Sequence, residues 1–368
     1  MAINEKKPTR EELTEQGEAL SNRLFGATLG ALDVMSVYLG WRLGLYTALD
    51  ESATASQLAG RAGIAERYAR EWLEQQAVTG LLQVDDPAKS AEERSYTLPP
   101  GYRVALTDAE SPFYVTPAAQ TLAVLMRALP AVEQAFRTGA GVPWSSYGRE
   151  ALESQGDLNR AWLLSSLGSD YLPKIGDIYS RLLADPPARV ADVACGLGWA
   201  AIALALAFPK IEIDAFDADE ESIAMARKFA AEKGVFDRIR FRVADAAQIS
   251  SGGPYDMALV VEAVHDLSQP VEVLEAVRKS LAPTGSLIVA DERVAETFTA
   301  PGDEVERFMY AASIFCCLPT GLSDKPSEAT GTVMRPSTLK AYANRAGFSR
   351  FEVLDLEHPL LRFYRMRP

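Results

Sequence analysis

The stretch Ala188–Gly234, ARVADVACGLGWAAIALALAFPKIEIDAFDADEESIAMARKFAAEKG, decides the fold of this chain. An apolar run at residues 189–194 leads into a loop that contains Gly196 and Gly198, an alanine-rich helical segment follows, and a second apolar run ends on Asp217. Glycines at such a loop let the backbone approach a ligand, which the next helix faces with its N-terminus. The stretch therefore predicts a β-α-β unit that binds a nucleotide.

The rest of the chain separates into regions of different pattern. Up to about residue 185 the periodicity is helical, whereas short β-rich runs alternate with helical ones from 188 onward, which is typical of a parallel sheet with crossover helices. Paired prolines in ADPPARV mark the border. We predict domains at 1–110, 111–187 and 188–368, with strands at 189–194, 212–217, 240–244, 257–262 and 285–290 and a terminal hairpin in FEVLDLEHPLLRFYRM.

The first region carries the pattern of a winged helix-turn-helix. Residues 32–49 form an apolar helix, Ser56 is placed to cap the next one, and Gly63 makes the turn before a helix at 66–78. Residues 81–84 pair with 96–98 as the wing. Such a unit binds DNA or serves as a structural, dimerising module.

Charge decides between these two roles. Residues 1–120 hold 11 lysines and arginines against 17 aspartates and glutamates, and the helix that would enter DNA carries three glutamates beside Arg67 and Arg70. Binding to DNA requires a basic footprint for the phosphates. We therefore expect a structural module and no nucleic-acid partner.

Composition narrows the class further. The 368 residues are 48% hydrophobic and 24% charged, as in a soluble globular protein, and the net charge of −13 argues against nucleic acid or an anionic membrane as the main partner. The N-terminus is polar, and no uninterrupted apolar run approaches the length of a membrane span. Cys195, Cys316 and Cys317 lack metal-ligand spacing, so we expect reduced thiols in the cytoplasm and no metal.

The glycine loop alone fits NAD about as readily as S-adenosylmethionine, since residues 196–201 satisfy the dinucleotide fingerprint with alanine last. Three other features separate the two ligands. Asp192 lies inside the strand before the loop, where a carboxylate would repel a pyrophosphate and favour a sulfonium and an ammonium. The third strand also ends on an acid, Asp245, and the terminal hairpin adds a reversed strand to the parallel sheet. These features predict S-adenosyl-L-methionine.

On these motifs, residues 188–368 resemble a class I S-adenosylmethionine-dependent methyltransferase. The full chain is similar in layout to the dimeric bacterial O-methyltransferases that carry an N-terminal winged-helix domain. The resemblance implies an α/β, Rossmann-like sheet of seven strands with the last strand antiparallel, a mostly helical N-terminal dimerisation domain, and a homodimer. It also implies a cofactor-binding set: Asp192, Ala194, Gly196, Gly198 and Trp199 at the first loop, Asp217 and Ala218 at the ribose, Asp245 and Ala246 at the adenine, and Glu262 at the cofactor's edge.

One position departs from that family, which usually has glycine where Ala194 stands. The methyl group of Ala194 is tolerated if the local φ is negative. If the local φ is positive, the methyl group is expected to alter the position of the amino-acid end of the cofactor.

The candidate catalytic residues follow the fourth and fifth predicted strands. His265, in VVEAVHDLSQP, lies where open α/β sheets bind their ligands, and the segment resembles that of the catalytic histidine of plant-type O-methyltransferases, with Leu267 in place of the usual tryptophan. By the same resemblance Asp291, with Glu292 beside it, orients the histidine. We expect His358 to be structural.

Two further segments are expected near the acceptor: the loop 139–148 as a lid or a plain connector, and Cys316–Cys317 as pocket lining. The predicted function is methyl transfer to a small molecule, with a hydroxyl of a specialised metabolite as the expected acceptor. The alternatives are C-, N- or S-methylation, a repurposed fold whose cofactor assists a cyclisation, and a DNA-binding regulator.

Overall fold

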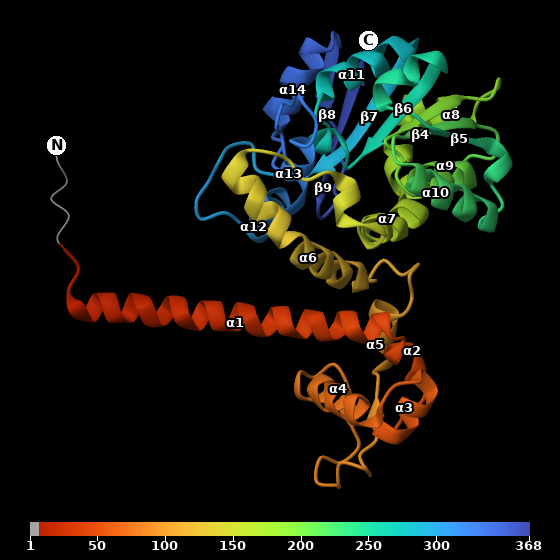
Figure 1. Cartoon of the computed structure of the whole chain (residues 1–368). Helices are drawn as coiled ribbons and strands as arrows, with labels where there is room; N and C mark the ends of the chain where they lie inside the picture. The colour runs from red at the N-terminus through yellow and green to blue at the C-terminus, as the bar shows by residue number, and fades with distance from the viewer. Residues whose placement is uncertain (1–6) are drawn as a thin grey trace. The chain divides into compact units, whose positions relative to one another are not determined.

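Seven strands form one sheet in the C-terminal part of the computed structural model (Figure 1), in the spatial order β5 (Ile239–Val243), β4 (Glu212–Asp217), β3 (Arg189–Val193), β6 (Tyr255–Val261), β7 (Leu281–Glu292), β9 (Leu361–Arg367) and β8 (Arg350–Val353). β9 pairs antiparallel with both β7 and β8, and the pairs from β5 to β7 are parallel. The predicted seven-stranded sheet with a reversed last strand is confirmed. The chain turns from one side of β3 to the other between β5 and β6, so a ligand crevice is expected above the carboxyl ends of β3 and β6.

The structure describes residues 7–368, which divide into two compact units, one ending at Ala123 and the other spanning Val124–Pro368. Helix α6 (Thr116–Thr138) runs across that division. The helical elements of the second unit are η1 (Trp144–Tyr147), α7 (Arg149–Trp162), η2 (Leu163–Tyr171), η3 (Leu172–Lys174), α8 (Gly176–Leu183), α9 (Trp199–Ala207), α10 (Glu220–Glu232), η4 (Phe236–Arg238), η5 (Ala246–Ser251), η6 (Val264–Asp266), α11 (Pro270–Ser280), α12 (Glu304–Ala312), η7 (Ser313–Cys317), α13 (Leu318–Gly321) and α14 (Pro336–Arg345).

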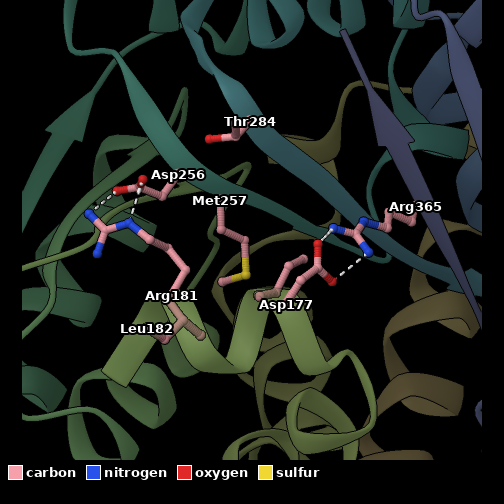
Figure 2. Close-up of a pocket in the computed structure, with 8 residues that line it drawn as sticks. Asp177, Arg181, Leu182, Asp256, Met257, Thr284 and Arg365 are labelled. Atoms are coloured by element: carbon pink, nitrogen blue, oxygen red, sulfur yellow. Dashed lines mark hydrogen bonds and ion pairs between the residues drawn. The ribbon is translucent and has the colours of Figure 1, made fainter. Parts of the chain in front are cut away.

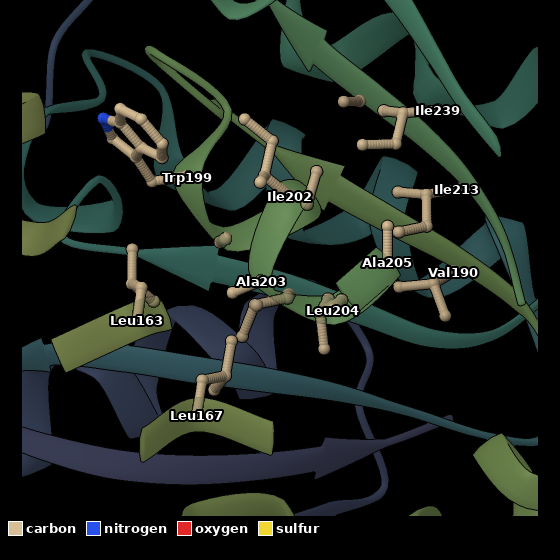
Figure 3. Close-up of a cluster of buried hydrophobic side chains, with 14 of the residues drawn as sticks. Leu163, Leu167, Val190, Trp199, Ile202, Ala203, Leu204, Ala205, Ile213 and Ile239 are labelled. Atoms are coloured by element: carbon tan, nitrogen blue, oxygen red, sulfur yellow. The ribbon is translucent and has the colours of Figure 1, made fainter. Parts of the chain in front are cut away.

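Helices cover both faces of the sheet. The side chains of α8, α9 and α10 share one core with β3 and β4, and those of α11 and α14 share a second core with β6 and β7. In Figure 3, α9 lies between the sheet residues Val190 and Ile213 and the π-helical η2 residues Leu163 and Leu167. Residues 199–205 of α9 are all buried, which agrees with a helix of alanine, leucine and isoleucine after Trp199.

Two charged pairs tie α8 to the amino-terminal edge of the sheet (Figure 2). Arg181 of α8 donates to both carboxylate oxygens of Asp256 in β6, at 2.8 and 3.0 Å. Arg365 of β9 donates to both oxygens of Asp177 at the start of α8, one of them at 2.8 Å. Bidentate pairing of this kind fixes the orientation of the two side chains as well as their charge. The pairs therefore hold α8 in place at one end of the sheet, and the candidate site lies at the opposite end.

The first unit contains α1 (Arg10–Arg42), α2 (Leu45–Ala48), α3 (Ala55–Ala62), α4 (Glu66–Val78), α5 (Pro100–Leu106) and the two-stranded wing of β1 (Gln83–Val84) and β2 (Tyr96–Thr97). The predicted turn at Gly63 and the helix 66–78 are found as expected. The predicted cap is wrong: Thr54, and not Ser56, caps α3, because Thr54 and Gln57 form a reciprocal capping box.

The predicted helix 32–49 is interrupted, and its first part belongs to a longer helix. α1 has 33 residues, begins at a capping box of Thr9 and Glu12, and ends before Gly44, whose φ is +67°. A side chain at Gly40 would meet the ring of Trp72 at 2.5 Å, so glycine permits α1 to approach α4 there. Trp72 Nε1 donates to Ser36 O at 3.0 Å across the same contact.

Helix α1, red in Figure 1, exposes a series of apolar side chains along its length. They include Leu13, Leu20, Leu24, Phe25, Leu29 and Leu32. By length and composition alone, α1 could cross a membrane, since its most apolar 18-residue window has a mean hydropathy of 1.3. Asp33 lies in this apolar part and accepts a hydrogen bond from Gln75 Nε2 of α4 at 3.1 Å. An apolar helix surface of this extent normally needs a covering partner.

Candidate active site

The loop between β3 and α9 has left-handed backbone at three positions. Ala194 has a φ of +56°, Gly196 of +51° and Gly198 of +75°. The methyl group of Ala194 was expected to be tolerated at a negative φ, and this condition is not met. The positive φ arises because the chain reverses sharply at the end of β3. A Cβ at Gly196 would point into open space, whereas one at Gly198 would meet Phe241 at 2.8 Å. Gly196 thus keeps the loop open toward a ligand, and Gly198 allows α10 and β5 to pack beneath it.

Asp217, at the end of β4, faces this loop. Its carboxylate accepts hydrogen bonds from Gly196 N at 2.7 Å and from Asp219 N at 2.9 Å. Burial raises the pKa of Asp217, and the two backbone donors oppose that effect. Ala218 follows it and is exposed. The carboxylate is therefore held at the rim of the glycine loop, where the predicted ribose contact requires it.

Two predicted cofactor residues lie beneath the loop and not on its open side. Asp192 is 1% exposed, and its carboxylate accepts from Ala201 N in the first turn of α9 at 2.9 Å. Burial raises the pKa of Asp192 to about 7. Trp199 is 5% exposed and stacks on Phe229 of α10 with ring centroids 4.9 Å apart. Both residues support the loop from within the fold.

The end of β5 contributes the predicted adenine contacts. Ala244 N donates to Asp217 O at 2.8 Å, which brings this strand end beside that of β4. Asp245 is exposed, and its Oδ1 accepts from Ala247 N at 2.8 Å, so it caps the 3-10 turn η5. Ala246 behind it is buried. The exposed carboxylate and the buried alanine lie on the same side of the sheet edge as Asp217.

Glu262, directly after β6, is held by a helix that sequence patterns did not connect to it. Its φ is +48°, and its Oε2 accepts from Gln155 Nε2 at 2.7 Å and from Asn159 Nδ2 at 2.5 Å. Trp162 Nε1 donates to Asn159 Oδ1 at 2.6 Å and so orients that amide. The three α7 residues carry no local motif. Only the helical i, i+4 spacing of Gln155 and Asn159 could have shown that both face one partner.

His265 lies in η6 after β6 and contacts two acids at the end of β7. Its Nδ1 is 2.8 Å from Asp291 Oδ1 and 3.1 Å from Glu292 Oε2, and both the histidine and Asp291 are nearly inaccessible to solvent. Asp291 Oδ1 also accepts from Glu292 N at 3.0 Å. The structure therefore brings together the histidine and the acid that the sequence had placed after neighbouring strands.

The electrostatics of this group follow from burial and from the number of acids. Burial alone would lower the pKa of His265, but the charges of Glu292, Asp291 and Asp266 outweigh it and raise that pKa well above its usual value. Burial raises the pKa of Glu292 well above its usual value, and the Asp291 charge adds to this effect. Two acids against one imidazole nitrogen thus favour a neutral Glu292 and a charged Asp291.

The other ring nitrogen has different neighbours. His265 Nε2 is 3.4 Å from Asp266 Oδ1, and the Sγ of Cys317, at the end of η7, belongs to the same group, whose ligand-type atoms all lie within 4.8 Å of one another. The loop 139–148 contacts the segment that carries Cys317: Val142 N donates to Pro319 O at 2.9 Å, and Tyr147 Oη donates to Phe315 O at 2.9 Å. The sequence analysis expected Cys317 in the pocket lining but did not connect it with Asp266, because 51 positions separate the two residues along the chain.

His358 has a structural role, as expected. Its Nδ1 accepts hydrogen bonds from Leu360 N at 3.2 Å and from Leu361 N at 3.0 Å, and its ring lies among those of Trp162, Tyr171 and Phe363. It is remote in chain position from His265 and organises the entry to β9.

The arrangement fits S-adenosylmethionine better than a dinucleotide. Carboxylates follow three of the four neighbouring strands β5, β4, β3 and β6: Asp245 after β5, Asp217 at the end of β4 and Glu262 after β6. The loop after β3, with the open Gly196, lies between the last two of them. A sulfonium and an ammonium are attracted to such a rim, and a pyrophosphate is repelled. The buried His265 with its acids lies past the end of β6, at the switch point of the sheet.

Comparison with known proteins agrees with this class. Residues 184–323 match the family described as "Methyltransferase domain", and residues 30–108 match the "Rv2258c-like winged HTH domain". A ubiquinone biosynthesis O-methyltransferase of Caulobacter sp. (strain K31) is 38% identical over 105 residues, which are 28% of this chain and 40% of that protein. This chain therefore matches well under two thirds of that relative's length.

Two solved structures share the architecture over the whole chain. Mitomycin 7-O-methyltransferase has a TM-score of 0.66 at 20% identity, with 96% of this chain and 100% of that chain covered. Human N-acetylserotonin methyltransferase, solved with S-adenosylmethionine, has a TM-score of 0.67 at 15% identity, with 100% and 99% covered. At these identities the likeness shows the fold.

Residues 184–323 are therefore a methyltransferase domain, and the sheet that contains them has the class I fold. Residues 30–108 are a winged-helix domain of the Rv2258c-like type, and the cofactor of the methyltransferase domain is S-adenosyl-L-methionine.

Proposed function

We propose that the protein transfers a methyl group to a hydroxyl of a small specialised metabolite. The observation that carries this proposal is the buried pair of His265 and Asp291, 2.8 Å apart, at the switch point beside the glycine loop. A hydroxyl is a weak nucleophile and gains from a base, whereas sulfur and many nitrogen acceptors do not require one. The pair therefore favours oxygen over the other acceptor atoms.

S-adenosylmethionine, when bound, supplies an electrophilic methyl group on a positively charged sulfur. The chain's own residues hold it: Asp217 at the ribose, Asp245 with Ala246 at the adenine, and the loop from Ala194 to Gly198 with Glu262 at the methionine end. Asp192 and Trp199 keep the loop in place from below. Alignment of acceptor and donor by such fixed groups supplies several kcal/mol of rate acceleration.

In this proposal His265 is the general base. Asp291 Oδ1 accepts a hydrogen bond from Nδ1–H, which fixes the ring and leaves Nε2 to take the proton of the acceptor hydroxyl. Because the neighbouring acids raise the pKa of His265, the neutral imidazole becomes more abundant as the pH rises. We therefore expect turnover to increase with pH above neutrality.

The test compares the two histidines of the chain. His265→Ala should lower turnover by about 10²–10⁴-fold with little change in cofactor affinity, since base catalysis is typically worth that much. His358→Asn is the matched control and should stay within a few-fold of wild type. Methyl transfer from labelled donor to a panel of phenolic and polyketide-type hydroxyls provides the readout. If His265→Ala retains near-normal turnover, the base role is wrong, and alignment alone or another acceptor atom is indicated.

The alternatives differ in what they require of the site. The same cofactor-binding residues would serve C-, N- or S-methylation or a cofactor-assisted cyclisation. None of these reactions requires a neutral His265. A DNA-binding regulator would need a basic winged helix, and the helix α4 instead pairs Arg67 with Glu71, and Arg70 with Glu92 of the wing segment. The two arginines are thus neutralised by glutamates and are not available to bind DNA phosphates.

The proposed partners are a small acceptor and a second copy of the chain, with no nucleic acid and no membrane. The exposed apolar face of α1 supports the homodimer. The three free cysteines suit a reducing compartment, so we propose the cytoplasm as the location.

A further inference from the structure

A group of metal-ligand type surrounds the outer nitrogen of His265. His265 Nε2, Asp266 Oδ1 and Cys317 Sγ come from η6 and from η7, and all three atoms lie within 4.8 Å of one another. The proposed methyl transfer uses only the nitrogen of this group. The thiol and the Asp266 carboxylate are left without a role in it.

The spacing suits a tetrahedral cation. With Zn–N and Zn–O bonds of about 2.1 Å, two ligands on a tetrahedral zinc are roughly 3.4 Å apart, and a thiolate sulfur is slightly farther. The distance from His265 Nε2 to Asp266 Oδ1 is 3.4 Å. The sulfur of Cys317 lies within 4.8 Å of the ligand atoms of the other two residues.

The charge around the group also calls for a cation. Asp266, Asp291 and Glu292 all lie against the single imidazole of His265, and Glu262 nearby accepts hydrogen bonds from two amides. Asp266 Oδ1 is a buried atom without a hydrogen-bond partner. Asp291 and Glu292 are buried, and buried acids that outnumber their cationic partner are normally neutralised by protons or by a metal ion.

We propose that His265, Asp266 and Cys317 form a binding site for a soft divalent cation of the Zn²⁺ type, and that an ion bound there blocks methyl transfer. The cation forms bonds to the imidazole lone pair, one carboxylate oxygen and the sulfur, and the thiol proton leaves to solvent. A mixed nitrogen, oxygen and sulfur donor set selects zinc over magnesium or calcium. The ion occupies the lone pair that would otherwise accept the proton of the hydroxyl.

Binding is tested with the metal alone. Co²⁺ added to the full-length protein should produce the visible bands of a tetrahedral site and a near-ultraviolet thiolate-to-cobalt band, which Zn²⁺ should displace. Cys317→Ser should abolish the thiolate band, and Asp266→Asn should weaken Co²⁺ binding by at least about tenfold. Cys195→Ser, a thiol of similar exposure in the glycine loop, is the control and should leave the spectrum unchanged. Absence of the band in wild type, or its persistence in Cys317→Ser, overturns the site.

The effect on turnover rests on the proposed function, whereas the binding does not. Zn²⁺ should inhibit the wild-type enzyme, a chelator should restore activity, and Cys317→Ser should resist inhibition at the same concentration, with each protein's activity measured against its own metal-free rate. Equal inhibition of wild type and Cys317→Ser places the inhibitory ion elsewhere and overturns the blocking role. A protein that binds Co²⁺ through Cys317 but transfers no methyl group contradicts the proposed function and leaves the metal site standing.

Discussion

Ala194 and Glu262 hold left-handed backbone at the ends of β3 and β6, which are neighbours in the sheet. This conformation costs a residue with a side chain about 1–2 kcal/mol. Strain of this kind persists where surrounding structure imposes it and tends to gather at functional sites. Here it falls on both sides of the switch point, where the cofactor is expected.

The strain at Ala194 leads to a stability prediction. Ala194→Gly should raise the free energy of unfolding by about 1 kcal/mol, because glycine adopts this φ without penalty and its greater chain entropy offsets only part of the gain. Ala224→Gly, at an exposed position inside α10, is the matched control and should lower stability by about 1 kcal/mol. Urea denaturation followed by circular dichroism measures both, and a loss of stability in Ala194→Gly contradicts the argument.

Asp217 provides the residue test of the cofactor assignment. Asp217→Ala should weaken S-adenosylmethionine binding by about 1.5–3 kcal/mol, the usual value of hydrogen bonds to a charged group. Isothermal calorimetry on wild type and variant measures the difference, with NAD as the control ligand. Tight binding of NAD together with no binding of S-adenosylmethionine would overturn the assignment.

At the scale of elements, the sheet was the most predictable part. Buried parallel strands are short apolar runs between turn signals, so β4 was found to the residue, and β3 and β5 within one or two residues. Helix limits were harder to predict, because competing caps such as Thr54 and Ser56 differ only in the contacts they make. The helix at 32–49 was predicted without its break at Gly44. The left-handed φ of this residue cannot be inferred from composition.

The candidate site was predictable only where topology collects residues. Strands that run parallel deliver their carboxyl ends to one edge, so His265 and Asp291 could be paired from chain position and resemblance. Gln155, Asn159 and Cys317 lie on helical segments whose docking is set by long-range packing, such as Gly156 against Leu197. No local pattern carries that information.

The turn before β9 gives a pH prediction. Burial, assisted by the charge of Arg293, lowers the pKa of His358 to about 4. The unfolded histidine, with a pKa near 6.5, takes up a proton before the folded one does. Stability contributed by the neutral ring is therefore present above about pH 6.5 and is lost as the pH falls toward 4.

His358→Asn tests this effect, since an amide oxygen can still accept from Leu360 N and Leu361 N but does not titrate. Between pH 7.5 and 5, wild type should lose more unfolding free energy than the variant, as measured by denaturant titration. Parallel pH profiles for the two proteins would show that His358 does not contribute to this dependence.

At the scale of the whole molecule, the exposed apolar residues of α1 lead us to expect a homodimer. Such residues are normally buried by a partner, and a second copy of the chain is the proposed partner. Light scattering should give twice the chain mass of 40.0 kDa. Phe25→Glu combined with Leu29→Glu should give monomers, because two charges one turn apart would be buried in the interface.

The control carries Glu15→Gln and Glu18→Gln, which change the charge of the same helix and leave its apolar residues in place; it should remain dimeric. A wild-type protein that is monomeric at micromolar concentration contradicts the dimer. Sedimentation of the wild type with lipid vesicles would instead assign α1 to a membrane.

The hydrogen bonds from α7 to Glu262 bear on how the enzyme can be engineered. Gln155 and Asn159 lie upstream of residues 184–323, which match the methyltransferase family. A chimera joined at the start of β3 would therefore separate the half-buried carboxylate of Glu262 from its two donors. Swaps of acceptor-binding modules between relatives should take α7 together with the residue after β6 as one exchangeable block.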